Sequence, residues 1–111
     1  MRLIQRLWSM VSAELVVGAT RSAQWQPLRT KVLTHYKECQ ACRGDESLEV
    51  HHIVPFQVAP ERELVLGNLL VLCRDCHYQL GHLRDWRSWN PTVVEDAGLY
   101  RVKRDNRPRV T

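Results

Sequence analysis

Two CxxC motifs constrain the fold of this chain more than any other feature of its sequence. Cys39 and Cys42 form the first pair, and Cys73 and Cys76 form the second pair after the intervening segment 43–72. Two residues between thiolates let both sulfurs of a turn face one ion, and zinc accepts four sulfurs in a tetrahedron. The alternatives are a disulfide or four unrelated buried thiols, but doubled CxxC spacing seldom arises by accident where thiols stay reduced. The pattern therefore predicts a structural zinc site that joins two distant parts of the chain.

The length and composition fit one small folded domain. The chain has 111 residues, of which 44% are apolar and 25% are charged, and this balance excludes a disordered protein. A domain of this size buries a limited core, so a bound structural metal would add to its stability. The formal net charge of +4 favours polyanionic partners only weakly, because many ordinary proteins are as basic.

The first residues do not read as an export signal or a membrane span. Their apolar stretch is interrupted by polar and charged side chains, namely Gln5, Arg6, Ser9, Ser12 and Glu14. We therefore expect a cytoplasmic protein whose cysteines are reduced and available to metal.

Six segments have the periodicity of regular structure. The predicted helices span 1–20, 27–38, 74–81 and 91–103, and the predicted strands span 48–54 and 69–72. Pro27 marks the start of one helix, and Asn90 with Pro91 reads as a cap and first turn of another. We expect an N-terminal amphipathic helix (1–20), one domain (21–103) and a basic tail (104–111). The N-terminal helix either packs on the domain or forms a dimer contact.

Histidines form a second group typical of a metal site. Cys76 and His77 lie about 100° apart around a helix, so one helix can present them to two separate ions. His82 lies five positions after His77, which is off the same face unless Gly81 ends the helix.

The adjacent histidines, His51 and His52, pose a geometric problem. Strict alternation along a strand sends the two side chains to opposite faces. They can serve one centre only if the strand twists or ends there, which the nearby Pro55 favours.

The order and spacing of these residues resemble the HNH endonuclease family. The matching segments are E-V-H-H-I-V-P at 49–55, G-N-L at 67–69 and L-C-x-x-C-H at 72–77. The three positions that give the family its name correspond to His52, Asn68 and His77. Further likeness to small HNH proteins of bacteria and their phages extends the resemblance over roughly 21–100.

The resemblance implies an α+β fold with a ββα-metal (His-Me finger) core, structural zinc-binding cysteines, and flanking N- and C-terminal helices. It assigns His52 as the general base, and His51 and His77 as ligands of one catalytic divalent cation. His82 is a further candidate ligand, and Asn68 orders the loop and holds the base. Because many members carry Asp where this chain has His51, the cation stays open among Mg²⁺, Mn²⁺, Ni²⁺ and Zn²⁺.

These residue types suit phosphodiester hydrolysis. An imidazole titrates near neutral pH, so His52 can accept a proton from water. A cation with open coordination positions can stabilise the phosphoryl and leaving oxygens. The side-chain carbonyl of Asn68 can accept a hydrogen bond from one ring nitrogen of His52 and direct the other nitrogen at water.

Several neighbouring residues are candidates for a supporting role. Arg74, Arg84 and Arg87 can contact DNA phosphates, although solvated surface charge is an equal expectation. Glu49 either pairs with an arginine or is an exposed strand residue. Two tryptophans of the C-terminal half, Trp86 and Trp89, are expected to pack on the core rather than stack on bases.

The leading hypothesis is a DNA endonuclease or nickase. The alternative is a non-catalytic zinc module that binds nucleic acid, and a third reading is a structural partner in phage or mobile-element machinery that docks through 1–20. No segment resembles a base-reading element, so the form of the DNA stays open.

Overall fold

The computed structural model describes residues 20–106. The helix predicted over 1–20 lies outside the described residues, apart from Thr20, as does the end of the predicted tail, 107–111. Within the described part of the chain, no helix is both long and apolar enough to cross a membrane.

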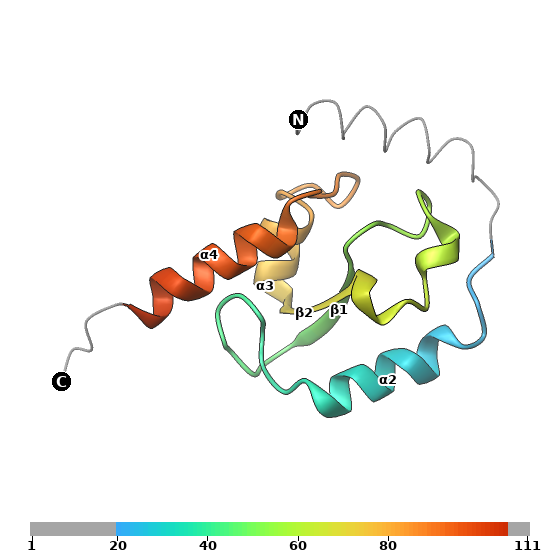
Figure 1. Cartoon of the computed structure of the whole chain (residues 1–111), viewed down its shortest axis with the longest axis horizontal. Helices are drawn as coiled ribbons and strands as arrows, with labels where there is room; N and C mark the ends of the chain where they lie inside the picture. Colours follow the sequence, from blue (N-terminus) through green and yellow to red (C-terminus); the bar gives the residue numbers. More distant parts are fainter. Residues whose placement is uncertain (1–19, 107–111) are drawn as a thin grey trace.

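An antiparallel hairpin forms the centre of the fold (Figure 1). Strand β1 (Leu48–His52) pairs with β2 (Leu69–Cys73), and its last residue lies opposite Leu69. β1 ends two residues before its predicted end. The reason is local, because the amide side chain of Asn68 bonds both the N–H and the C=O of Val54, at 2.8 and 3.1 Å, in place of a strand partner.

Helix α2 (Trp25–His35) covers one face of the hairpin. Val32 packs there against Val50 and Val71, which strand alternation places on the same face. The predicted start at Pro27 is wrong by two residues. The proline is still in the first helical turn, where its missing N–H costs no intrahelical bond.

The opposite face is covered by the elements that follow β2. Helix α3 (Arg74–Cys76) continues directly into a π-helical turn, η3 (His77–Gly81). Leu70 and Leu72 of β2 pack on this side with a second set of buried residues, which consists of Cys39, Ala41, Cys76, Val93 and Ala97. The hairpin with α3 and η3 is the ββα unit that the sequence predicts, so the predicted fold class is confirmed.

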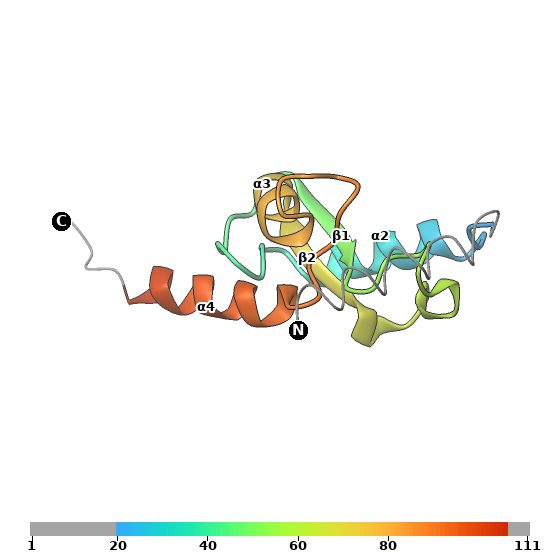
Figure 2. The same ribbon diagram turned by 90° about the horizontal axis from the view of Figure 1, so that it is seen from above.

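Helix α4 (Val93–Asp105) extends away from the hairpin (Figure 2). Its predicted start at Pro91, with Asn90 as the cap, is wrong by two residues. The buried Asn90 side chain instead holds the preceding turn, since its Oδ1 accepts hydrogen bonds from the backbone N–H and the hydroxyl of Thr92, both at 3.0 Å. The helix continues two residues past its predicted end, to Asp105, which pairs with Arg43.

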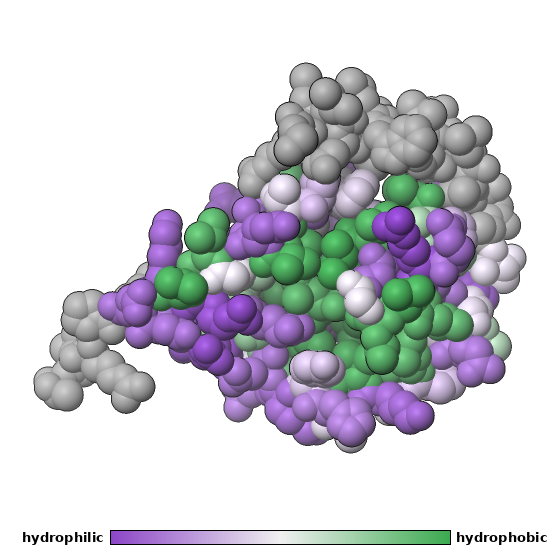
Figure 3. All heavy atoms as spheres, viewed as in Figure 1, coloured by the Kyte–Doolittle hydropathy of each residue, from purple (hydrophilic) through white to green (hydrophobic). Residues whose placement is uncertain are grey.

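The segment 53–68 between the strands contains two short 3₁₀ turns, η1 (Pro60–Arg62) and η2 (Leu66–Asn68). Figure 3 shows apolar side chains across the centre of the face seen in Figure 1 and hydrophilic ones along its lower edge. The segment contributes three exposed apolar residues, Leu64, Val65 and Leu66.

Candidate active site and metal centres

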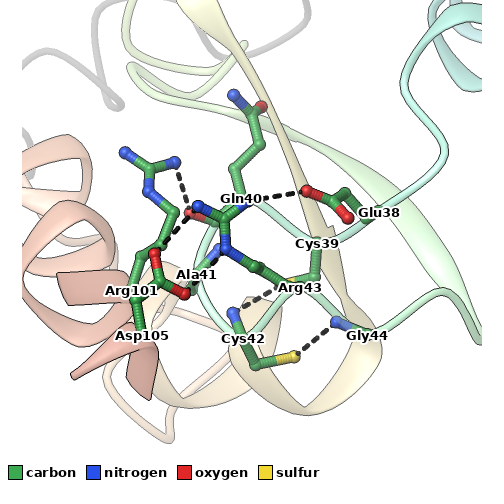
Figure 4. Close-up of polar contacts among 9 residues, drawn as sticks. All are labelled: Glu38, Cys39, Gln40, Ala41, Cys42, Arg43, Gly44, Arg101 and Asp105. Carbon is green, nitrogen blue, oxygen red and sulfur yellow. Dashed lines mark hydrogen bonds and ion pairs between the residues drawn. The ribbon is translucent and has the colours of Figure 1, made fainter. Parts of the chain in front are cut away.

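The four cysteines meet at one end of the hairpin. Their sulfurs all lie within 4.8 Å of one another, and Cys42 Sγ is 3.7 Å from Cys73 Sγ. Backbone N–H groups donate to the sulfurs at 3.3–3.4 Å within both knuckles, including that of Gly44 to Cys42 Sγ (Figure 4). Such donors stabilise thiolate charge. The clustering brings the four predicted ligands within metal-binding distance of one another, which suggests the structural zinc site predicted from the CxxC pairs.

The titration of these thiols also favours a cation. Burial raises the pKa of Cys76, and the charges of Cys39 and Cys73 raise it further. Burial likewise raises the pKa of Cys73. At Cys39 burial acts in the same direction, but backbone N–H donors outweigh it and lower the pKa. The raised pKa values of Cys73 and Cys76 mean that a bound cation would favour their thiolate forms, which fits a closed structural zinc site.

Helix α4 is tied to the first knuckle by arginines (Figure 4). Arg43 donates two hydrogen bonds to Asp105 and one to Glu38, each at 2.9 Å, and Arg101 donates to the carbonyl of Gln40 at 2.9 Å. The Arg43 pairs are exposed and add little stability by themselves. Their two-pronged geometry instead orients α4 on the cysteine site.

Three histidines form a second cluster. The candidate ligand atoms of His51, His77 and His82 lie within 4.8 Å of one another, and the Nε2 atoms of His77 and His82 are 3.2 Å apart. His51 is buried, and its Nε2 atom has no hydrogen-bond partner among the described residues. Burial, reinforced by the neighbouring histidines, lowers the pKa of His51 to about 2, so this imidazole is neutral and ready to donate a lone pair. An orphaned nitrogen facing two other imidazoles fits a cation site.

Hydrogen bonds orient the other two imidazoles. His77 donates from Nδ1 to Glu49 Oε1 at 3.1 Å, and His82 donates from Nδ1 to the Ser88 carbonyl at 2.8 Å. Each bond occupies Nδ1 and leaves Nε2 as the ring nitrogen directed at the cluster. Glu49 therefore supports the site, as one reading of the sequence expected, but its partner is His77 and not an arginine. The sequence contained an indication of this role, because Glu49 and His51 are two residues apart and therefore lie on the same face of β1.

The π-helical turn explains how His82 joins His77. The His82 N–H donates to the His77 carbonyl at 3.1 Å, across five residues, and this wider turn brings the two side chains together. The helical segment also ends at Gly81, as the sequence argument required. Gly81 has a second role, since a Cβ there would lie 3.0 Å from His51 Cε1 and 3.1 Å from His77 Cδ2.

His52 borders the same cleft as the cluster. The cleft has a volume of about 360 Å³ and is lined by His51, His52, His77 and His82, among others. The two adjacent histidines do lie on opposite strand faces, because His52 contacts Trp25 of α2, with ring centroids 4.3 Å apart. They reach one cleft because β1 ends at His52.

The ring of His52 is held by a backbone carbonyl. His52 Nε2 donates to the Glu63 carbonyl at 3.1 Å, and burial lowers the His52 pKa against the opposing effect of this bond. The predicted contact between Asn68 and His52 is wrong. The Asn68 amide is used by Val54 and by the Arg62 carbonyl, so it holds the loop that carries Glu63.

Positive charge in the cleft comes from arginines that the sequence argument did not select as phosphate contacts. Arg21 and Arg29 line it, and Arg21 also donates to the buried carboxylate of Glu63 at 3.4 Å. Arg21 lies four residues before Trp25 and Arg29 lies four residues after it. This regular spacing was the sequence feature that could have identified the two arginines as neighbours of Trp25.

The three predicted DNA contacts lie elsewhere on the described part of the chain. Arg84 and Arg87 are exposed in the turn after η3, and Arg74 lines a hollow beside the cysteines. None of the three lines the cleft, so their contact with DNA stays a prediction.

The two tryptophans of the C-terminal half differ in exposure. Trp89 is partly buried, and its indole Nε1 atom has no partner among the described residues. Trp86 is 52% exposed and contacts the rings of His77 and His82. The prediction that Trp86 packs on the core is therefore wrong.

Loss of the cysteine-bound metal is expected to unfold the domain. Structural zinc contributes about 10–16 kcal/mol, which is comparable with the whole stability of a small domain, about 5–15 kcal/mol. Thermal melts followed by circular dichroism, with metal content by mass spectrometry, should show no cooperative transition for Cys76→Ser or for chelated protein. His77→Ala is the control and should keep one zinc and its melt. A native melt of metal-free protein would contradict this account.

Gly81→Ala should weaken metal binding by the histidines and spare the cysteines. Its Cβ forces the His51 ring to move, and such displacement of ligand geometry typically costs 10- to 100-fold in affinity. Gly98→Ala is the matched control, since its Cβ meets no atom within 4 Å. Calorimetric titration of the zinc-loaded proteins with Ni²⁺ measures the difference. Equal Ni²⁺ affinity in both variants would show that the space at Gly81 is not needed.

Comparison with known proteins gives one match. Residues 39–83 match the family model described as HNH endonuclease, and this range contains both CxxC pairs and the predicted His52, Asn68, His77 and His82. No curated protein and no solved structure matches the chain. With the ββα fold and the two clusters, this match places the segment 39–83 in the HNH endonuclease family.

Proposed function

We propose that this chain is a metal-dependent endonuclease that hydrolyses phosphodiester bonds of DNA, with His52 as the general base. The observation that carries the proposal is the meeting of His52 and the cluster of His51, His77 and His82 in one cleft. A module that only bound nucleic acid would need the cysteine site but not an ordered imidazole beside a second set of ligands.

His52 is prepared to accept a proton. Its Nε2 proton is engaged by the Glu63 carbonyl, which leaves the lone pair on Nδ1 for a water molecule. The Trp25 ring fixes the plane of the imidazole from one side. Because burial lowers its pKa, His52 is neutral at ordinary working pH and competent as a base.

The cluster of His51, His77 and His82 would hold the catalytic cation. When bound, a divalent cation supplies charge stabilisation for the phosphoryl and leaving oxygens. Three imidazole nitrogens favour Ni²⁺ or Zn²⁺ over Mg²⁺, which prefers oxygen ligands. Arg21 and Arg29 add positive charge for a phosphate at the cleft.

A plasmid-nicking assay at low salt tests the proposal. We expect nicking with Ni²⁺, Mn²⁺ or Zn²⁺ at concentrations where Mg²⁺ supports less, and a loss of about 100-fold or more in His52→Ala, since a positioned base contributes about 10²–10⁴-fold. The matched control is His35→Ala, which removes an exposed histidine of α2 away from this cleft.

Two results would contradict the proposal. Unchanged nicking by His52→Ala would remove this residue as the base. DNA binding without cleavage under every metal would favour the non-catalytic zinc module.

A further inference from the structure

A tryptophan side chain lies open to solvent at the rim of the cleft. Trp86 is 52% exposed, although it lines the cleft and contacts two of the candidate metal ligands. Its ring centroid is 5.3 Å from that of His77 and 4.9 Å from that of His82. Trp25, the other cleft tryptophan, differs because its ring contacts the His52 ring and the Arg21 guanidinium.

The turn that carries Trp86 is rigidly built. The Arg84 N–H donates to the Tyr78 carbonyl at 2.9 Å, and the Tyr78 hydroxyl donates to the Arg84 carbonyl at 2.6 Å. Leu83 and Arg84 both have positive φ, at 54° and 65°, a costly conformation that surrounding contacts must maintain.

The indole is also supported from the side. The Tyr78 ring contacts it with a centroid distance of 5.0 Å. A side chain already held in place loses little conformational entropy when a ligand covers its free surface. Trp86 is therefore a preformed aromatic surface beside the site of the proposed chemistry.

A nucleobase is the ligand that such a surface fits. The Trp86 ring contacts His77 and His82. When the phosphate of a nucleotide lies among the histidines and arginines of the cleft, its base is therefore within reach of the Trp86 ring. Stacking on an aromatic side chain accepts any base, because every base has a π face. In a duplex, however, neighbouring bases cover both faces, so only an unpaired or displaced base can stack on the protein.

We infer that Trp86 is a stacking platform for one unpaired nucleobase next to the cleaved phosphate, and that the substrate is single-stranded or locally unpaired DNA. This inference deepens the proposed nuclease function and rests on it for the position of the phosphate. It predicts a preference that depends on strand state and not on base identity.

The test compares binding of one fluorescent oligonucleotide as a single strand and as a duplex. The protein carries His52→Ala so that the DNA stays intact, and Ni²⁺ is present. Adding Trp86→Ala should weaken single-strand binding by about 10-fold or more and leave duplex binding unchanged, whereas Trp86→Phe should retain most of it. Tyr36→Ala is the matched control, because Tyr36 is 53% exposed and does not line this cleft.

A scan of abasic sites separates stacking from a structural role. In the protein that retains Trp86, removal of the base at one position of the single strand should weaken binding about as much as Trp86→Ala does. In the Trp86→Ala protein, removal of the same base should have no further effect on binding. If Trp86→Ala also loses Ni²⁺ affinity, its weaker DNA binding has two causes. The abasic scan in the protein that retains Trp86 then tests stacking without changing the metal site. Absence of any sensitive position, or equal losses for single strand and duplex, would overturn the platform.

The outcomes distinguish the platform from the nuclease. Nicking that requires His52, combined with binding that ignores Trp86, overturns the platform and leaves the nuclease. Single-strand binding that requires Trp86, without cleavage under any metal, supports the platform and overturns the nuclease. A protein that neither binds nor cleaves DNA overturns both.

Discussion

The convergence of four cysteine sulfurs is the constraint on which the rest of the structure depends. A two-stranded hairpin is marginal in water by itself, and here it is covered by short helices that bury a small core. The cysteine cluster joins the knuckle at Cys39 and Cys42 to the end of β2, and Arg43 ties the same knuckle to α4. Stability of the hairpin and placement of α4 therefore both follow from one ligand set.

The histidine cluster uses the same run of chain. β2 leads into α3, which contributes Cys76 to the sulfur cluster, and η3 with its C-cap residue then contributes His77 and His82 to the histidine cluster. The π-helical turn makes this possible without a break, because its five-residue repeat aligns two histidines that an α-helix would separate. One segment thus contributes to a cluster of sulfurs and to a cluster of imidazole nitrogens, which suit different metal chemistries.

Sequence reasoning could predict the features that depend on residue type and spacing. The paired CxxC motifs indicated the sulfur cluster, and apolar runs indicated both strands of the hairpin. The features it missed depend on competition for hydrogen bonds. The amide of Asn68 satisfies loop backbone rather than His52, and Glu49 supports His77 rather than an arginine.

Helix geometry set a second limit on prediction. No propensity rule distinguishes a π turn at η3 from an ordinary α-helical turn, so His82 could be only a tentative ligand. The exposure of Trp86 was equally hidden, because the turn before it contains two residues with positive φ, Leu83 and Arg84. Residue identity at those two positions gives no sign of that conformation.

The most direct test of the account is X-ray absorption at the nickel edge, on protein that holds zinc at the cysteines and one equivalent of added Ni²⁺. The account predicts a nickel first shell of nitrogen and oxygen with the scattering pattern of about three imidazoles and no sulfur, because His51, His77 and His82 form a centre separate from the thiolates. The zinc edge of the same sample should show sulfur alone. Sulfur around nickel, or nickel without imidazole, would contradict the separation of a structural and a catalytic centre.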